Sequence, residues 1–252
     1  MAQVPAAVRT LSVLKLLAAA PGSLSAAVIA RKLELPRSST YHLLQAMQNE
    51  GFLTYYPDER TWGLGVSVFE VGSAYLRHEP LERLARPLLA ALVNSVAVPV
   101  VAHLGILQGR ETLYLLKEAP RKPVTLVTDI GVRLPAHLTA SGRAILAALP
   151  AAQVRAVFPS HDAFSDRTGR GPQSPAELRT VLSDELRAGF SFEDEFVTEG
   201  YVSLAAPVLD RSGHPTASIA CTLRKQDYSQ DSQTVIAAAI HKAVRELERR
   251  SR

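Results

Sequence analysis

Apolar residues at the start of the chain recur at the spacing of an amphipathic helix. A stripe with a period of three residues runs through positions 8–18 and stops at Pro21-Gly22; it consists of Val8, Leu11, Leu14 and Leu17. This period is typical of a helix that buries one face, and a Pro-Gly pair ends helices. The pattern therefore predicts a first helix that packs through these four side chains.

Two further short helices are predicted directly afterwards. Ser25 is a suitable N-cap for a helix over residues 26–33. Pro36, a residue favoured in the first helical turn, begins a third helix, which ends at Gly51. Leu43, Leu44 and Met47 form the inward face of this third helix.

A β-hairpin follows the third helix. Residues 52–56 and 61–64 are aromatic and β-branched runs, and Pro57-Asp58-Glu59-Arg60 joins them with residues common in turns. Three short helices and a hairpin are the order of a winged helix-turn-helix, whose third helix enters the DNA major groove. We therefore expect a DNA-binding domain over residues 1–65.

The pattern changes after a helix over residues 66–76. A break at His78-Glu79-Pro80 separates it from a second helical stripe over residues 81–96. We therefore expect a linker helix over residues 66–79 and a second domain over residues 80–252. We read strands at 98–107, 112–119, 124–127, 190–193, 202–209 and 216–223, and helices at 141–149, 151–158, 175–188 and 231–249.

Strands interrupted by blocks of helices predict an α+β domain with a mainly antiparallel sheet, covered by one layer of helices. Residues 160–173 are rich in Ser, Asp, Gly and Arg, which predicts a mobile surface loop.

Composition restricts the class of protein. The chain has 252 residues, 47% of them hydrophobic, so it can build packed cores. Cys221 is its single cysteine, which excludes an internal disulfide and a site with several thiolates. We expect a cytoplasmic protein with no membrane partner, because we find neither a secretory signal nor a long apolar run.

Charge is concentrated at the N-terminus. The whole chain carries a net charge of +4, and residues 1–49 hold five basic residues and one acid, which also gives +4. A solvated helical face would show the same excess, so charge by itself does not establish nucleic-acid binding.

Several stretches, in order and spacing, resemble the isocitrate lyase regulator (IclR) family of bacterial transcription factors. They are Val8-Arg9-Thr10-Leu11, residues 35–40 with Leu43-Leu44, Gly51-Phe52-Leu53, residues 62–65 with 71–75, residues 134–144, and residues 200–208. The resemblance covers nearly the whole chain. It implies a winged helix-turn-helix, a linker helix and a GAF-like effector domain that binds a small organic molecule. It also implies homodimers, in some cases dimers of dimers, on palindromic double-stranded DNA operators.

Two positions depart from the family pattern. Glu34 stands where the turn between the second and third helices usually has Gly, and Phe196 stands where an acidic run commonly continues. The first bears on the conformation of the turn, and the second bears on the identity of the effector.

The start of the third helix offers groups that suit DNA. Arginine pairs with phosphate or with guanine, and hydroxyl and imidazole groups reach bases or backbone. The candidates are Arg37, Ser38, Ser39, Thr40, Tyr41 and His42. Ser and Thr at this place also cap helices without any DNA, and Tyr41 equally suits the core. At the hairpin turn Arg60 is expected to touch the DNA backbone, although a lone arginine in a turn is commonly just solvated.

The effector pocket is assigned from the resemblance. Its expected lining residues are Leu134, Ala140, Ser141, Glu193, Tyr201, Ser203, Ala220 and Thr222. Ser203 and Thr222 lie in otherwise apolar strands, where a buried hydroxyl needs a partner, either a ligand or the neighbouring backbone. Cys221 alternates away from Thr222 and is expected in the core.

We find no recognised catalytic motif in the chain. It lacks a Gly-x-Ser-x-Gly elbow, a His-Glu-x-x-His helix and a phosphate-binding glycine loop. Glu193, Asp194, Glu195 and Glu199 suit a metal, but a solvated acidic loop is the commoner meaning. We expect no catalytic residue, metal or cofactor, and a regulator that senses a small organic acid or related metabolite. The alternatives are a hydrolase-like enzyme or a dimerising interaction module built on the second domain.

Overall fold

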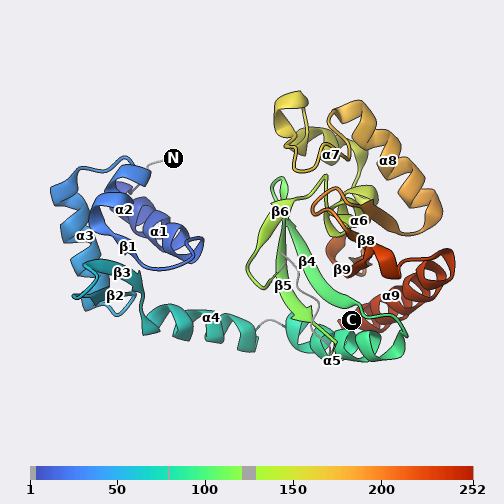
Figure 1. The fold of residues 1–252 in the computed structure, drawn as a ribbon, viewed down its shortest axis with the longest axis horizontal. Helices are drawn as coiled ribbons and strands as arrows, with labels where there is room; N and C mark the ends of the chain where they lie inside the picture. The colour runs from blue at the N-terminus through green and yellow to red at the C-terminus, as the bar shows by residue number, and fades with distance from the viewer. Residues whose placement is uncertain (1–3, 79, 121–128, 252) are drawn as a thin grey trace. The chain divides into compact units, whose positions relative to one another are not determined.

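The computed structural model describes residues 4–78, 80–120 and 129–251. The chain divides into two compact units, Met1–His78 and Glu79–Arg252 (Figure 1). The strand expected at residues 124–127 lies outside the described residues. Among the described residues, no helix combines the length and the apolar character needed to span a membrane.

The first unit confirms the three predicted helices and the hairpin. Its elements are α1 (Pro5–Ala18), β1 (Leu24–Ser25), α2 (Ala26–Lys32), α3 (Arg37–Asn49), β2 (Leu53–Tyr56), β3 (Thr61–Leu64) and α4 (Val66–His78). The two-residue strand β1 was not predicted; it pairs with β3, which also pairs with β2, so a small antiparallel sheet backs the helices.

The core of this unit lies between the helices and the sheet. It consists of Val13, Leu17, Ile29, Leu44, Met47, Leu53 and Trp62. The prediction of Leu44 and Met47 as inward residues is confirmed. The prediction for the first helix is partly wrong, because Val8 and Leu11 are 47% and 56% exposed. The buried face of α1 follows the four-residue step from Val13 to Leu17 instead.

The turn between α2 and α3 has left-handed backbone at Glu34, with φ +53°. The Leu35 N–H donates to the Ala30 carbonyl at 2.9 Å, and the Glu34 N–H donates to the Arg31 carbonyl at 3.4 Å. These two bonds are a Schellman motif, which requires a left-handed residue after the helix and favours glycine there. The departure at Glu34 therefore leaves the turn intact, with a side chain in a strained position.

The second unit contains a sheet whose six described strands run in the order β6-β5-β4-β9-β8-β7, all antiparallel. The strands are β4 (Val101–Gln108), β5 (Glu111–Glu118), β6 (Arg133–Pro135), β7 (Ser191–Asp194), β8 (Tyr201–Leu209) and β9 (Pro215–Arg224). The α+β class with a mainly antiparallel sheet is confirmed, and β6 was not predicted.

Helices lie on both faces of this sheet. They are α5 (Pro80–Ser95), α6 (Ala140–Ala148), α7 (Ala151–Val157), α8 (Pro175–Ala188) and α9 (Gln230–Arg250), with short 3-10 turns η1 (His161–Ala163) and η2 (Lys225–Asp227). The apolar side chains of α5 and α9 share a core with Ile219, Cys221 and Leu223 of β9. On the opposite face Ala140 and Ala144 of α6 pack on Ala205 and Ala220. The prediction of one helical layer is therefore wrong (Figure 1).

The segment expected to be a mobile loop makes specific contacts. The Thr168 hydroxyl donates to the Glu195 carbonyl at 2.7 Å, and Ala163 is buried. A Cβ at Gly171 would lie 2.8 Å from Leu138 Cδ2 and 2.9 Å from Phe196 Cδ2. Side chains of this segment thus reach the residues that follow β7.

The strained residue in the helix turn leads to a stability prediction. Glu34→Gly should stabilise the first unit by about 0.5–1 kcal/mol, because the left-handed penalty of about 1–2 kcal/mol exceeds the entropy cost of glycine. Urea unfolding followed by the fluorescence of Trp62, the single tryptophan and a core residue of this unit, measures the change.

A glycine at an ordinary helical position is the matched control. Gln45→Gly, at an exposed position within α3, should destabilise the unit by about 1 kcal/mol. Equal destabilisation by both substitutions would contradict the strain assigned to Glu34.

Candidate functional site

The start of α3 presents a polar surface in the first unit. Arg37, Ser38, Ser39, Tyr41 and His42 are all exposed on its first two turns. Ridges of polar side chains at the start of a recognition helix suit contact with phosphates and base edges. Five of the six candidates on this helix therefore lie where DNA can reach them.

Thr40 does not belong to this surface. Its side chain is fully buried, and its hydroxyl donates to the Pro36 carbonyl at 3.0 Å. The helical phase turns position 40 toward the same interior as Leu44, four residues later. The expectation that Thr40 contacts DNA is therefore withdrawn.

The hairpin side of this surface mixes charges. Arg60 is exposed and has left-handed backbone with φ +52°. The neighbouring Glu59 carboxylate accepts hydrogen bonds from the Ser23 and Thr61 hydroxyls, each at 3.2 Å. Tyr41 packs edge-on to Trp62 of β3, with ring centroids 6.4 Å apart. The helix and the hairpin thus form one continuous surface in which Arg60 is accompanied by an acid.

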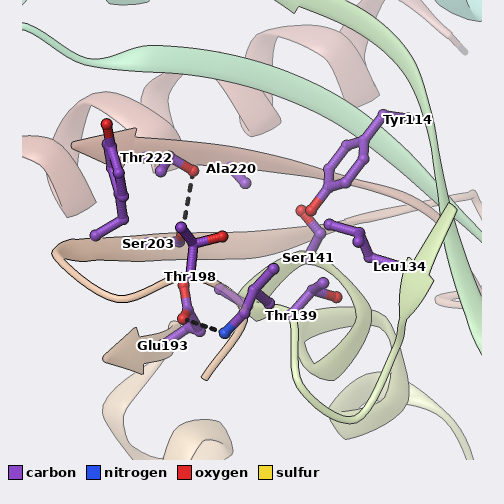
Figure 2. Close-up of a pocket in the computed structure, with 12 residues that line it drawn as sticks. Tyr114, Leu134, Thr139, Ser141, Glu193, Thr198, Ser203, Ala220 and Thr222 are labelled. Atoms are coloured by element: carbon purple, nitrogen blue, oxygen red, sulfur yellow. Dashed lines mark hydrogen bonds between the residues drawn. The ribbon is translucent and has the colours of Figure 1, made fainter. Parts of the chain in front are cut away.

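In the second unit, the residues expected around an effector do surround one cavity. All eight line it: Leu134, Ala140, Ser141, Glu193, Tyr201, Ser203, Ala220 and Thr222 (Figure 2). The free space between the lining atoms, its mouth included, is about 460 Å³. Much of this space is solvent at the mouth, and the enclosed room is only about 30 Å³, enough for a few water molecules, so an effector has to widen the cavity.

Four further lining residues were missed from the sequence. They are Tyr114, Thr139, Val197 and Thr198. Tyr114 lies on β5, which is two strands away from β9 in the sheet and far from it in sequence. The alternation of a strand predicts which face of the sheet a Tyr lies on, but it does not predict which residues of other strands lie beside it.

Strand register brings two hydroxyls together on one side of the cavity. Ser203 of β8 pairs directly with Thr222 of β9, and their hydroxyl oxygens are 3.0 Å apart. Each hydroxyl therefore has the other as a partner, whereas the sequence-based alternatives named a ligand or the neighbouring backbone. Cys221 points to the opposite face as predicted, and burial raises the pKa of its thiol.

The other side of the cavity is the start of α6. Thr139 caps this helix, since its hydroxyl accepts from the Gly142 N–H at 3.0 Å. Within the described residues the N–H groups of Ala140 and Ser141 have no partner, as expected for the first positions of a helix. These N–H groups and the helix dipole make this end of the cavity favourable for an anion.

Tyr114 adds a neutral hydroxyl to this end. Burial raises its pKa to about 12. Its hydroxyl points toward Ser141 in Figure 2. The ring also contacts that of buried His103, with the centroids 5.0 Å apart and the planes tilted by 52°. The phenol is therefore an uncharged hydrogen-bonding group at neutral pH.

Glu193 is the acid of the cavity, and it is 3% exposed. One carboxylate oxygen accepts from the Phe196 N–H at 2.6 Å and from the Val197 N–H at 3.1 Å. Burial raises the pKa of Glu193, although these backbone donors, Ser203 and Arg143 act in the opposite direction. The carboxylate is thus desolvated and already oriented by the backbone.

A buried arginine supports the cavity from below. The Arg143 guanidinium is fully buried and donates to the Glu185 carboxylate at 2.9 Å and to the Phe192 carbonyl at 2.7 Å. It also donates to the carbonyls of His137 and Leu138, at 3.1 and 2.9 Å. Arg143 therefore fixes the segment before α6 to β7, one on each side of the cavity.

A metal site is not found in the part of the chain that the structure describes, where no three His, Cys, Asp or Glu side chains gather closely enough to hold an ion. Glu193 and Glu195 instead accept hydrogen bonds from backbone N–H groups, and Asp194 and Glu195 form ion pairs with Lys225. The acidic run thus has structural partners.

Two family models match the chain. Residues 73–249 match the C-terminal domain of the bacterial transcriptional regulator IclR, and residues 6–57 match the IclR helix-turn-helix domain. The chain is 28% identical over 245 residues to the transcriptional repressor IclR of Escherichia coli (strain K12), covering 97% of this chain and 89% of that protein.

Solved structures have the same fold. An IclR transcriptional regulator from Alicyclobacillus acidocaldarius matches with a TM-score of 0.88 and 19% identity over 100% of both chains. An IclR homologue from Microbacterium hydrocarbonoxydans, solved in complex with 4-hydroxybenzoate, matches with a TM-score of 0.80 and 23% identity, covering 97% of this chain and 98% of that one.

Because the Glu193 carboxyl is desolvated, its ionisation is predicted to lower the free energy of unfolding in a pH-dependent way. Because the pKa of Glu193 is raised in the folded state, ionisation above its ordinary value of 4.5 destabilises the fold, and below that value the cost disappears. Glu193→Gln keeps an acceptor for the two backbone N–H groups but cannot ionise. The variant should therefore gain stability relative to the parent as pH rises.

Thermal unfolding of both proteins from about pH 4 to about pH 8 measures this difference. Glu199→Gln, an exposed position in the same loop, is the control and should show no comparable trend. A stability difference between the Glu193→Gln variant and the parent that is constant over this pH range would refute the assigned cost.

Proposed function

The chain belongs to the IclR family of bacterial transcriptional regulators, and we propose that α3 reads its operator while the cavity beside α6 binds its effector. The observation that carries the second assignment is the convergence of all eight expected residues on one cavity. The helix-turn-helix domain binds DNA, and the C-terminal domain is the effector-binding domain. We assign residues 1–65 to the winged helix-turn-helix, 66–79 to the linker helix and 80–252 to the effector domain.

The proposed DNA contacts lie on the exposed face of α3. Arg37, Ser38, Ser39 and His42 reach the major groove, with Tyr41 at the edge toward the hairpin. Arg60 touches the backbone at the turn of the hairpin. Because Glu59 lies beside it, the hairpin contributes less attraction for phosphates than α3 does.

The proposed effector is a small organic acid. Its carboxylate lies at the Ala140 and Ser141 N–H groups, where the start of α6 favours negative charge. Its other polar group lies toward Glu193, which accepts a hydrogen bond and would repel a second carboxylate. The bound 4-hydroxybenzoate in the similar structure carries one carboxylate and one hydroxyl, which supports a ligand of this pattern.

The site is proposed to sense this acid without transforming it. No His, Lys, Arg or Cys is among the described residues that line the cavity. The Ser203 hydroxyl pairs with Thr222 and also lies beside Glu193, whose carboxylate already accepts from two backbone N–H groups. A hydrolase would need an activated nucleophile. The effector then changes operator affinity only through its different affinities for two arrangements of the protein.

We propose a homodimer, because one recognition helix reads only a few base pairs and a two-fold dimer reads two half-sites. The apolar helical faces from residue 66 to 96 are the candidates for the contact, but the part from Leu81 onward packs in the core of the second unit. The contact surface is therefore α4, where Val66, Phe69 and Val71 are 66%, 74% and 59% exposed.

Since bacterial operators lie in the cytoplasm, we place the protein there.

Arg37→Ala should weaken operator binding by about 1–3 kcal/mol if the side chain reads a base. If it contacts phosphate, affinity should fall uniformly across sequences, with a shallower salt dependence. Gel-shift and fluorescence titrations with a bound genomic fragment measure both quantities, and the stoichiometry of the complex should be two chains per palindromic site.

The control for this substitution removes an exposed arginine from the other unit. Arg179→Ala of α8 should leave operator affinity unchanged. Unchanged affinity and salt dependence in a folded Arg37→Ala protein would show that α3 is not positioned as proposed.

Thermal-shift screening of small organic acids, with 4-hydroxybenzoate among them, should identify an effector that stabilises the chain. Ser203→Ala and Glu193→Gln should then weaken its binding by about 1–3 kcal/mol, since each removes a hydrogen-bonding group from the cavity. Thr180→Ala, at an exposed position of α8, is the control. Undiminished affinity in both cavity variants means that the site is elsewhere, and turnover of the acid by the parent means that sensing is the wrong function.

A further inference from the structure

Residues 195–200 connect β7 to β8 and form one wall of the cavity. Val197, Thr198 and the following Tyr201 line it from this side. The residues deeper inside are almost inaccessible, with exposed fractions of 1% for Ser141, 2% for Ala220 and 3% for Glu193. The enclosed room is only about 30 Å³, so the lining, of which this wall is a part, has to move before a small organic acid can reach these groups.

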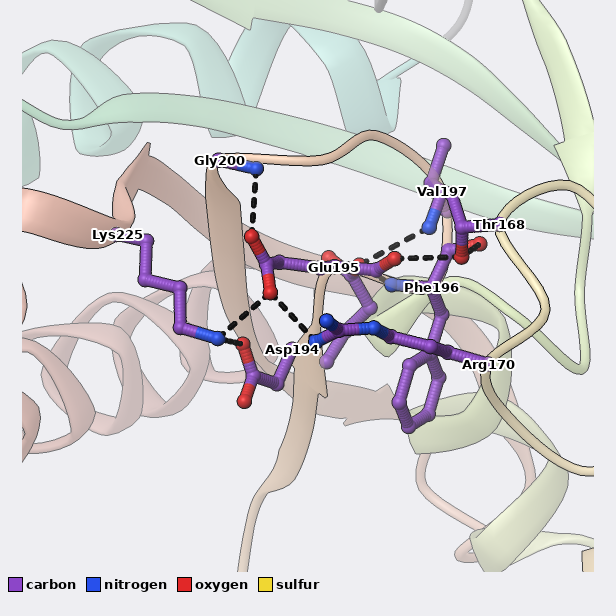
Figure 3. Close-up of polar contacts among 9 residues, drawn as sticks. Thr168, Arg170, Asp194, Glu195, Phe196, Val197, Gly200 and Lys225 are labelled. Carbon is purple, nitrogen blue, oxygen red and sulfur yellow. Dashed lines mark hydrogen bonds and ion pairs between the residues drawn. The ribbon is translucent and has the colours of Figure 1, made fainter.

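The wall is tied down from inside by Glu193, which accepts from the Phe196 and Val197 N–H groups, and from outside by Glu195, whose contacts are drawn in Figure 3. Glu195 has left-handed backbone with φ +62°, and it is not among the residues that line the cavity. One of its carboxylate oxygens accepts from the Gly200 N–H at 2.8 Å, so the side chain closes the 195–200 loop on itself.

The second oxygen of Glu195 binds two cations from distant parts of the chain. Arg170, in the loop before α8, donates to it at 2.5 Å, and Lys225, at the start of η2 directly after β9, donates to it at 2.7 Å. Lys225 also pairs with Asp194 at 2.7 Å. The hydrogen bond from Lys225 is the largest of several contacts that lower the pKa of Glu195.

Further contacts hold the same loop. The Thr168 hydroxyl donates to the carbonyls of Glu195 and Phe196, at 2.7 and 3.2 Å, and Arg167 donates to the Val197 carbonyl at 3.2 Å. The Phe196 ring lies 5.0 Å from the Arg143 guanidinium. The Glu195 side chain does more than these contacts, because it joins the two ends of the loop to each other and binds both Arg170 and Lys225.

We propose that Glu195 is a positioning residue of the effector site, whose ion pairs with Lys225 and Arg170 hold the 195–200 loop closed over the cavity. A small organic acid enters when these pairs yield, so their strength sets how readily the cavity opens and how tightly it holds the acid. This inference rests on the proposed effector function of the cavity. Glu195 itself does not touch the effector.

Alkylation of a cysteine inside the cavity measures opening without any effector. Ser141→Cys places a thiol of nearly the same shape in the cavity, and Cys221 contributes little background because it is fully buried on the other face. The full-length chain is treated with iodoacetamide, and mass spectrometry gives the rate of modification at position 141.

Adding Glu195→Gln to this protein should raise the alkylation rate roughly 3- to 10-fold, since two partly exposed ion pairs are lost and the loop opens more often. Lys225→Met should also raise the alkylation rate, whereas Lys225→Arg, which keeps the positive charge, should leave the rate slow. The matched control is Glu118→Gln, which removes the pair between Arg86 and Glu118, 3.3 Å apart and away from the cavity; it should have no effect.

A Glu195→Gln rate no faster than that of Glu118→Gln would overturn the proposal. Salt gives a second measurement that needs no substitution at Glu195: about 1 M NaCl screens exposed pairs and should accelerate alkylation of the Ser141→Cys protein. A rate independent of salt would also overturn the proposal. If no organic acid binds the chain, the proposed function fails, and these rates still decide whether Glu195 closes the loop.

Discussion

The cavity depends on one buried cation. The Arg143 guanidinium holds segments that are distant in sequence, and its partners are the carbonyls of His137, Leu138 and Phe192 and the carboxylate of Glu185. A fully buried cation is stable only when hydrogen-bond acceptors replace the water molecules that it loses on folding. Removing one member of a buried ion pair is strongly destabilising, because the other charge is left without a partner. Because Glu185 also accepts from the Phe192 N–H at 3.1 Å, α6, α8 and β7 are fixed as a unit.

Small residues allow α6 to lie close to the sheet and to the turn that precedes the helix. A Cβ at Gly142 would lie 2.3 Å from the Ala136 carbonyl oxygen, so only glycine allows this approach of α6 to the turn before it. Alanines of the helix and the sheet meet beside it. The helix therefore lies close to the strands, and its first N–H groups face the hydroxyls of β8 and β9 across a small space. The cavity is a consequence of this close approach at one end of the helix.

Local features of the fold were predictable from the sequence, and long-range ones were not. The hairpin, Gly51 and the Ser25 cap are properties of a few neighbouring residues, and the structure confirms them. Thr40 was misassigned because a polar residue at the start of a helix can turn either way. Tyr114 was missed because α6, which is distant from it in sequence, packs on the sheet and brings Ser141 beside it. The eight cavity residues came from the family resemblance, since periodicity alone gives a face and not a partner.

Two acids two residues apart have opposite surroundings, and this difference connects the cavity to the surface of the unit. Glu193 is desolvated and binds the backbone of the loop from inside, whereas Glu195 binds the same loop and two cations from outside. An effector that hydrogen bonds to Glu193 changes the hydrogen bonds that its carboxylate accepts from the Phe196 and Val197 N–H groups. Its binding energy is therefore partly spent on the conformation of the loop, and only a ligand that favours one loop conformation over another can change the rest of the protein.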